Sequence, residues 1–589
     1  MGVRAAMAAA RAVPLALSSC VALVMAFVAN RGLDPVDESY LLRMVDNPQA
    51  TRPAGDVYLF AFVVHPLYEL VGRDVAALRL AGFAIVAVAA AVLCRESLAL
   101  LAAGGVVLRR SHVVLAVAVA AAASLFVFSF DVAVPAYRSV ALVGLMAVAV
   151  GVARALRGHA VVGGACLGSG GWVTFVGKPT SAAALVVVLL VVVAGARLVS
   201  RRLVAATVVS GLVAAVLTLA VAQLSPAAAL DYLSRGADGS SRLGNHSGVA
   251  MMLGLTNLRL EGLVVLGPLF VLPLVVARAW GAQAGRRRHA AFELGYAAAM
   301  VAVTVAACLL AGRWLGGMGL GWQVFSVGLV VPVVVAVHLA HRARSRGLVG
   351  RAVPGEAAYL GLLLVLPWVS AVGSNVSFTV GMPLTAVFWV VALAVVTFPR
   401  EGAAADRAGF RRAMTLAAAL TLTMTVAEQT NGLPGGDLSA TLRPAQVGGG
   451  TLLLRPDDAT AAQLIHDAAR RGGLGPDTPV VDLTGVGAGY AFLAGGRPIG
   501  RAHLYADLPD SLAAARVSLD SASCGERARA WVVTAPSMGT GITPALTRGR
   551  VSFADDYEVM ARFTSRQARG TWEIQLLRPT SSVPQRMGC

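Results

Sequence analysis

Long apolar segments follow one another along most of the chain, separated by short polar or charged connections. Each segment has about the 20 residues that a helix needs to cross the hydrocarbon core of a bilayer. We therefore predict an α-helical polytopic membrane protein. Its thirteen expected spans lie at approximately residues 12–29, 76–94, 112–130, 139–156, 160–176, 181–198, 203–223, 260–279, 292–311, 320–340, 356–373, 380–398 and 411–427.

Basic residues fall on alternate connections between these segments. The arginines concerned are Arg109, Arg110, Arg154, Arg157, Arg197, Arg201, Arg202, Arg286, Arg287, Arg288, Arg342, Arg344, Arg346, Arg351, Arg407, Arg411 and Arg412. Because arginine and lysine concentrate on the cytoplasmic side of membrane proteins, these connections are predicted to be cytoplasmic. With thirteen spans, the N-terminus is then cytoplasmic and the C-terminus extracytoplasmic. The first apolar segment is interpreted as an uncleaved span rather than a signal peptide.

The composition changes after residue 427. Residues 428–450 are rich in Gly and Pro and are expected to form a linker, which separates a transmembrane domain of residues 1–427 from residues 451–589. Ala459–Arg471 has the pattern of an amphipathic helix, and short apolar runs predict strands at Thr451–Leu454, Pro479–Leu483, Ala530–Thr534 and Thr571–Leu577. This length suffices for one small domain, so we expect an extracytoplasmic α/β domain.

Overall composition narrows the classes of partner. Hydrophobic residues make up 57% of the 589 residues, 14% are charged, and the formal net charge is +18. Binding of nucleic acid is not expected, because the arginines lie in short loops between apolar segments and the positive-inside rule explains them. Membrane lipids are the expected surroundings. The sequence contains no His/Cys cluster with zinc spacing and no Walker sequence, so neither a metal nor a cofactor is expected.

Two smaller features lie in the C-terminal region. Cys524 and Cys589 are its only cysteines, and in an oxidising compartment we expect them to form a disulfide. Gly485, Gly487 and Gly489 alternate with other residues after a predicted strand, as in part of a dinucleotide-binding loop. The full pattern is missing and nucleotides are not expected outside the cell, so we interpret this segment as a turn.

The first outer loop, residues 30–75, differs in charge from the rest of the chain. It holds seven acidic residues against four arginines, and Asp34, Asp37 and Glu38 lie close together at its start. Carboxylates at a membrane edge suffer desolvation, so such a cluster indicates a chemical or binding task. Adjacent side chains point in different directions, so one is expected to act as a general base and its neighbour to position a group. The alternative is structural: Asp37 caps a helix that begins there.

Several short motifs follow one another in the first 200 residues. They are Asp37-Glu38, His65-Pro66-Leu67-Tyr68, Asp74 followed by Leu78-Arg79-Leu80-Ala81-Gly82, Val134-Pro135-Ala136-Tyr137-Arg138-Ser139, and Gly177-Lys178-Pro179-Thr180. Together with the multi-span layout, these motifs resemble those of the GT-C glycosyltransferases, the membrane enzymes that include protein O-mannosyltransferases and aminoarabinose transferases.

The resemblance implies an inverting transfer of a sugar from a polyprenyl-phosphate donor to a glycan, lipid or protein of the cell envelope. The reaction would take place on the outer face of a bacterial inner membrane. By motif position the catalytic base is Asp37, with Glu38 and Asp34 as supporting or alternative acids. The presence of Asp34 three residues before Asp37 leaves the assignment among the three open.

A departing phosphate requires positive charge at the outer leaflet. Lys178 is the first candidate, because it is the only lysine in the chain and lies at a short outer turn. Arg138 lies at another outer turn, and the 224–259 loop adds Arg235, Arg242 and His246. The alternatives are that Lys178 extends to the lipid headgroups and that the 224–259 loop is simply solvated.

Two other classes of function remain open. A transporter or lipid-carrier flippase would place ionisable residues in mid-membrane positions and contain inverted repeats, whereas the charges here cluster at helix ends. A non-catalytic envelope assembly protein would use the C-terminal domain as a binding module. Transfer of labelled sugar by the purified protein discriminates among the three.

Overall fold

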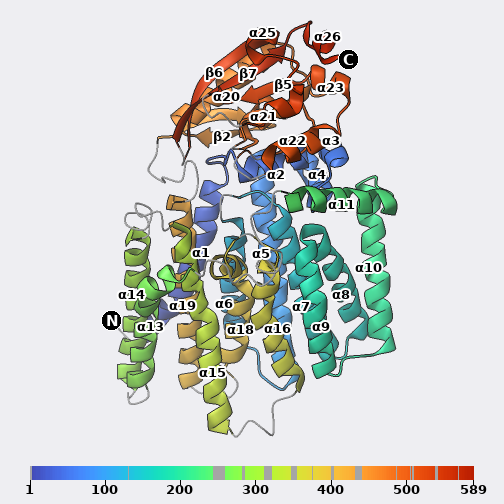
Figure 1. Cartoon of the computed structure of the whole chain (residues 1–589). Coiled ribbons are helices and arrows are strands. Elements are labelled where there is room, and N and C mark those ends of the chain that lie inside the picture. Colours follow the sequence, from blue (N-terminus) through green and yellow to red (C-terminus); the bar gives the residue numbers. More distant parts are fainter. Residues whose placement is uncertain are drawn as a thin grey trace.

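The computed structural model describes most of the chain. The described residues are 3–129, 132–242, 259–281, 286–310, 321–346, 354–374, 376–399, 404–431, 441–485, 487–504, 506, 510–536, 541–567 and 570–589. Long helices form a bundle, and a smaller region that contains a β-sheet covers one end of it (Figure 1). The predicted class, a helical polytopic membrane protein with a small C-terminal α/β domain, is confirmed.

Every predicted span overlaps a helix. The bundle contains α1 (Val3–Val28), α5 (Val75–Ala103), α6 (Arg110–Ser124), α7 (Tyr137–Leu156), α8 (Ala160–Gly177), α9 (Pro179–Gly195), α10 (Arg201–Val221), α13 (Glu261–Gly281), α14 (Arg286–Leu310), α15 (Val330–Arg346), α16 (Pro354–Ala371), α17 (Phe378–Gly381), α18 (Val387–Thr397) and α19 (Ala404–Asn431).

The expected number of thirteen spans is not confirmed. Seven helices within the described residues are long and apolar enough to cross a membrane, and an eighth candidate is the pair 378–385 and 387–397, which bends by 63°. The other apolar helices, such as α9 and α16, are shorter or carry polar ends. Hydropathy alone does not reveal such bends and early helix ends, because they depend on packing between helices.

Two glutamates form ion pairs with arginines of the connections predicted to be cytoplasmic. Glu96 of α5 forms ion pairs with Arg154 and Arg157 at the end of α7. Glu293 of α14 does the same with Arg411 and Arg412 of α19. These pairs tie neighbouring helices together at ends for which the sequence predicts cytoplasmic connections.

A layer of shorter helices lies across the other end of the bundle. It consists of α2 (Asp37–Asp46), α3 (Pro48–Thr51), η1 (Arg52–Ala54), α4 (Phe60–Leu70) and α11 (Pro226–Arg242). Figure 1 shows this layer between the bundle and the C-terminal domain. All but α11 belong to the first outer loop, so this loop is built of helices and separates the two main parts of the molecule.

The C-terminal domain is built on a five-stranded sheet with strand order β4-β3-β5-β7-β6. The strands β3 (Pro479–Asp482), β4 (Arg497–Pro498) and β5 (Trp531–Thr534) are parallel, whereas β7 (Gly570–Pro579) is antiparallel to both β5 and β6 (Tyr557–Gln567). The helices of the domain include α20 (Pro456–Arg471), α21 (Gly489–Ala494) and α22 (Ser511–Leu519).

A β-hairpin links this domain to both ends of the first outer loop. It consists of β1 (Arg443–Val447) and β2 (Gly450–Leu454), and β1 lies within the segment expected to be a linker. At the start of the loop, the Leu453 amide donates to the Asn30 carbonyl over 2.8 Å. At its end, the Gly449 amide donates to the Arg73 carbonyl over 2.9 Å. The two ends of the loop are therefore held by one hairpin.

The first outer loop and the C-terminal region also share a hydrophobic core. Side chains of the loop such as Leu42, Phe60 and Tyr68 are fully buried in one cluster with hairpin and helix residues. Those partners include Val447, Leu452, Leu454, Ala459 and Phe492. The sequence places the loop in the transmembrane domain, and its packing joins it to the C-terminal domain as well.

Candidate active site

Asp34 organises the start of α2. Its Oδ2 accepts hydrogen bonds from the backbone amides of Val36 and Glu38, both over 3.1 Å, and from that of Asp37. The Ser39 hydroxyl donates to the Asp34 carbonyl over 2.5 Å. The three bonds to Oδ2 satisfy backbone amides that a helix start leaves without partners. Burial and the nearby Asp37 charge raise the pKa of Asp34 to about 7, against the lowering effect of these amides. The capping role considered for Asp37 therefore belongs to Asp34.

Glu38 forms a buried ion pair with Arg79, which lies in the first turns of α5. The Arg79 Nε donates to Oε1 over 2.9 Å, and one terminal nitrogen donates to Oε2 over 2.5 Å. The same guanidinium donates to the carbonyls of Ala29 and Gly32, both over 2.9 Å. Both side chains are 0% exposed. Every donor of this arginine therefore serves to hold the first outer loop against the bundle.

Asp37 has no such structural partner among the described residues. Its side chain is half-buried and stands on the first turn of α2. Burial raises the pKa of Asp37, and the positive charge of Arg138 lowers it in part. A carboxylate that is shielded from solvent, lies beside a cation and makes no structural hydrogen bond has the properties of a general base.

Arg138 lies at the start of α7, close enough to Asp37 for its positive charge to lower the pKa of that carboxyl group. Its Nε donates to the Tyr137 hydroxyl over 2.9 Å, and its guanidinium lies 5.4 Å from the centre of the Tyr137 ring. Tyr137 stacks on Tyr58, with ring centres 4.6 Å apart and an angle of 11° between the planes. The two rings form an aromatic platform that fixes the position of Arg138.

Lys178 lies in the turn between α8 and α9 and is 5% exposed. Its Nζ donates to the Ser370 carbonyl of α16 over 2.8 Å, and the nearby Thr180 hydroxyl donates to the Val372 carbonyl over 3.0 Å. It is close enough to Arg138 for the two positive charges to repel. This burial differs from the alternative in which Lys178 extends to the lipid headgroups. The positive charge of Arg138 therefore acts on both Asp37 and Lys178.

The other cations proposed from the sequence are not part of this group. Arg235 lies on α11, where it pairs with Asp231 and donates to the Pro53 carbonyl over 2.6 Å. The side chain of Arg242 and the whole of His246 lie outside the described residues. Within the part of the chain that the structure describes, no group of three His, Cys, Asp or Glu side chains has the arrangement of a metal site.

The C-terminal domain contacts the segment that carries Asp37. The Gly489 amide donates to the Pro35 carbonyl over 2.9 Å, and a Cβ added at Gly487 would lie 2.2 Å from that same oxygen. In the last turn of α2, Arg43 is buried and donates to the Val480 carbonyl of β3 over 2.6 Å. The glycine-rich turn identified in the sequence thus packs on the first outer loop, and it needs glycine for this close approach.

Sequence reasoning missed several of these residues or their roles. In the sequence, Arg79 and Tyr137 stand out only as parts of motifs. A signal for Arg79 was present, because an arginine among the apolar residues of a predicted span requires a partner of opposite charge. No signal in the sequence links Gly487 or Arg43 to their partners, which lie more than 400 positions away.

Comparisons with known proteins add a distant likeness to solved structures. No model of a protein family matches the sequence, and no curated protein matches it. Among solved structures, the crystal structure of ArnT from Cupriavidus metallidurans in the apo state is similar over 96% of this chain and 98% of that chain. The TM-score is 0.39 and the sequence identity is 14%. Both values are low, so the function proposed below rests on the residues of the site.

Proposed function

We propose that the chain is a membrane glycosyltransferase of the GT-C type. It transfers a sugar from a polyprenyl-phosphate donor to a hydroxyl group of a cell-envelope glycan, lipid or protein, at the outer face of a bacterial inner membrane. The observation that carries the proposal is that three neighbouring carboxylates differ in their contacts. Asp34 and Glu38 are engaged in structural contacts, whereas the Asp37 side chain has none among the described residues and is within reach of the positive charge of Arg138.

In the proposed reaction, Asp37 accepts the proton of the acceptor hydroxyl while that oxygen bonds to the anomeric carbon. The bond between this carbon and the phosphate oxygen breaks on the opposite face, so the configuration is inverted. The electron pair stays with polyprenyl phosphate as the leaving group. Arg138 and Lys178 stabilise the negative charge that develops there. Arg138 also favours the ionised form of Asp37 because it lowers the pKa of that carboxyl group.

The position of the site supports a reaction at the membrane surface. Asp37 belongs to the helical layer between the bundle and the C-terminal domain, and Lys178 lies where two apolar helices meet. A polyprenyl chain is soluble only in the bilayer, whereas its phosphate and sugar are polar. A carboxylate and two cations at the end of an apolar bundle suit such an amphipathic substrate.

The test is transfer of radiolabelled sugar from polyprenyl-phosphate donors by purified protein in detergent. Asp37→Asn removes the proton acceptor with little change in shape, so we expect transfer to fall by at least about a hundredfold. Asp46→Asn is the matched control, because Asp46 lies on the same helix and makes only a partly exposed ion pair with Arg73. This control is expected to retain transfer.

Two outcomes would contradict the proposal. A fully active Asp37→Asn variant would remove Asp37 from the mechanism. Movement of the donor across vesicle membranes without any labelled product would favour the flippase instead. Lys178→Gln provides a second check, because loss of a cation that stabilises the leaving phosphate is expected to lower kcat more than it raises the KM of the donor.

A further inference from the structure

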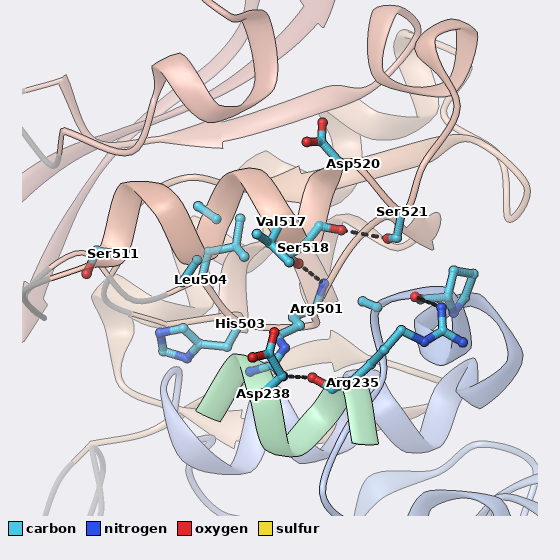
Figure 2. Close-up of a pocket in the computed structure, with 14 residues that line it drawn as sticks. Arg235, Asp238, Arg501, His503, Leu504, Ser511, Val517, Ser518, Asp520 and Ser521 are labelled. Carbon is cyan, nitrogen blue, oxygen red and sulfur yellow. Dashed lines mark hydrogen bonds between the residues drawn. The ribbon is translucent and has the colours of Figure 1, made fainter. Parts of the chain in front are cut away.

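A cavity of about 270 Å³ lies apart from the residues proposed for catalysis, between the C-terminal domain and the helical layer. Figure 2 shows α22 on one side and α11 on the other, with Arg501 and His503 between them. Pro53 and Ala54 of η1 complete the wall. Three separate parts of the chain therefore build this cavity: the first outer loop, α11 and the C-terminal domain.

The elements that meet next to the cavity are closely packed against one another. A terminal nitrogen of Arg501 donates to the Gly236 carbonyl over 2.9 Å, which joins the C-terminal domain to α11. A Cβ added at Gly236 would lie 2.1 Å from the backbone of Asp56, and one added at Gly55 would lie 2.6 Å from the Tyr232 carbonyl. Such close backbone contacts leave little freedom of movement, so the cavity is preformed.

The charges that line the cavity balance. Arg235 and Arg501 stand against Asp238 and Asp520. Both arginines already donate to backbone carbonyls, and Asp520 pairs with arginines outside the cavity. Burial lowers the pKa of His503 to about 4, so its ring is neutral at neutral pH. A lining of this kind provides no excess of either charge and therefore favours a neutral ligand over an anion.

The remaining lining combines hydroxyl groups with apolar surface. Ser511, Ser518 and Ser521 lie along α22 and just after it, and Ser518 Oγ accepts from the Arg501 amide over 2.7 Å (Figure 2). Leu504 and Val517 supply apolar contacts. Sugar rings have the same two features, hydroxyl edges and C–H faces. The volume lies just below the roughly 300–1,000 Å³ of drug-sized ligand pockets, which suits one or two rings.

We propose that this cavity binds a neutral saccharide unit of the acceptor. The inference rests on the proposed function and deepens it, because it assigns the acceptor a sugar-containing segment. Tyr40 connects the two sites: its hydroxyl donates to Asp56 over 2.7 Å, and its ring meets that of His503 edge-on, 6.1 Å between centres. Tyr40 lies about one helical turn after Asp37 on α2, so a saccharide in the cavity is held beside the helix that carries the base.

The experiment measures binding directly and needs no transfer. Purified full-length protein in detergent is titrated with methyl glycosides of glucose, mannose, galactose and arabinose, with saturation-transfer NMR as the readout. Glucose 6-phosphate is the charged comparator. The Val517→Trp variant fills the cavity from a side chain that is 50% exposed, so folding is preserved. Arg516→Trp adds the same ring at the neighbouring exposed position on α22, which does not line the cavity.

We expect at least one neutral glycoside to bind the wild type and Arg516→Trp, and to lose binding in Val517→Trp. In the transfer assay, Val517→Trp should raise the acceptor KM by at least about tenfold and leave the donor KM unchanged. The inference is overturned if no neutral glycoside binds, if Val517→Trp binds as the wild type does, or if glucose 6-phosphate binds better. If glycosides bind as expected but Asp37→Asn retains transfer, saccharide binding in the cavity is supported and the proposed role of Asp37 as the base is wrong.

Discussion

Arg79 donates two hydrogen bonds to Glu38 where neither side chain reaches solvent, and this pair fixes the first turn of α2 to the first turns of α5. Glu38 also accepts from the Ala133 amide over 3.2 Å, so its carboxylate joins three parts of the chain. Because Asp37 and Glu38 are adjacent on a helix, their side chains diverge. The contacts of Glu38 therefore determine where Asp37 points, while Asp37 itself remains available for chemistry.

Removal of one partner of this pair is expected to destabilise the protein strongly. Glu38→Gln leaves the buried guanidinium of Arg79 without its countercharge, which typically costs about 3–5 kcal/mol. Thermal unfolding in detergent, followed by circular dichroism, measures the effect. Glu69→Gln is the control, because Glu69 pairs with Arg73 at the surface, where ion pairs contribute only about 0–1 kcal/mol. Equal stability of the two variants would contradict a structural role for Glu38.

The pH dependence of transfer is expected to report Asp37. A general base must be deprotonated, so kcat/KM falls as the pH drops through the pKa of the carboxyl group in the folded protein. Burial raises that pKa above its ordinary value of 3.8, so the acid limb should lie at higher pH than for an exposed aspartate. Arg138 lowers the pKa, so Arg138→Gln should move the limb to still higher pH, whereas Arg138→Lys should largely restore it.

The control for this profile is Arg95→Gln. Arg95 is an exposed arginine in the second half of α5, away from the outer layer. Its removal changes the net charge of the protein by the same amount and should leave the acid limb in place. An acid limb that moves equally in both variants would indicate a general effect of charge, and the assignment of the limb to Asp37 would then be wrong.

The sequence predicts elements that depend on local interactions better than elements that depend on contacts between distant parts of the chain. The apolar pattern predicts α7, α8 and α10 to within about two residues at each end, because a helix in a bilayer is fixed by its own sequence. It does not predict the bend before α18 or the strand β1, because these depend on partners elsewhere in the chain. β1 in particular occupies a segment whose Gly and Pro content is typical of a linker, and its pairing with β2 stabilises it. The hairpin is in turn held by bridges from Gly448 and Leu453 to the first outer loop.

The same reasoning applies to the candidate site. The carboxylate cluster is visible in the sequence, and so are Arg138 and Lys178 as candidate cations for the departing phosphate, because charges at membrane edges are unusual. It left the roles of Asp34, Asp37 and Glu38 open. The three acids lie within five positions, and only the fold shows that Asp34 contacts amides and Glu38 contacts an arginine 41 positions away.

Arg43 is expected to hold the C-terminal domain on α2. Its buried guanidinium donates to the Val480 carbonyl, and the negative charge of Asp482 acts on it. Arg43→Met keeps much of the packing volume but removes these interactions, so β3 should lose protection in hydrogen–deuterium exchange while α7 keeps its own. Arg52→Met, a substitution in the same loop, should leave the protection of β3 unchanged. Unaltered exchange of β3 in Arg43→Met would show that the contact does not hold the domain.

The disulfide between Cys524 and Cys589 is expected to stabilise the C-terminal domain. The two residues are 65 positions apart, and their Cα atoms lie 5.7 Å from each other. Closing a loop of this length restricts the unfolded chain and contributes about 4 kcal/mol. Replacement of both cysteines by serine should therefore lower the unfolding temperature of the domain, whereas Cys20→Ser should not. Peptide masses that show two free thiols in the native protein would contradict the disulfide.

Gly487 is expected to control the position of the segment that carries Asp37. A Cβ at this position would lie 2.2 Å from the Pro35 oxygen and 3.1 Å from the Val36 Cα, and neither backbone can move without shifting the start of α2. Gly487→Ala should therefore lower kcat by about tenfold or more while the donor KM changes little, because misplacement of a base by a fraction of an ångström impairs proton transfer.

Gly475→Ala is the matched control for this substitution. It adds the same methyl group to the same domain, where the nearest atom lies 3.9 Å away. The control should leave both kcat and stability unchanged. A correlated check is the pH profile: if Asp37 moves away from Arg138 in Gly487→Ala, its pKa rises, and the acid limb shifts to higher pH. A variant with normal kcat and an unshifted limb would show that the C-terminal domain does not position the base.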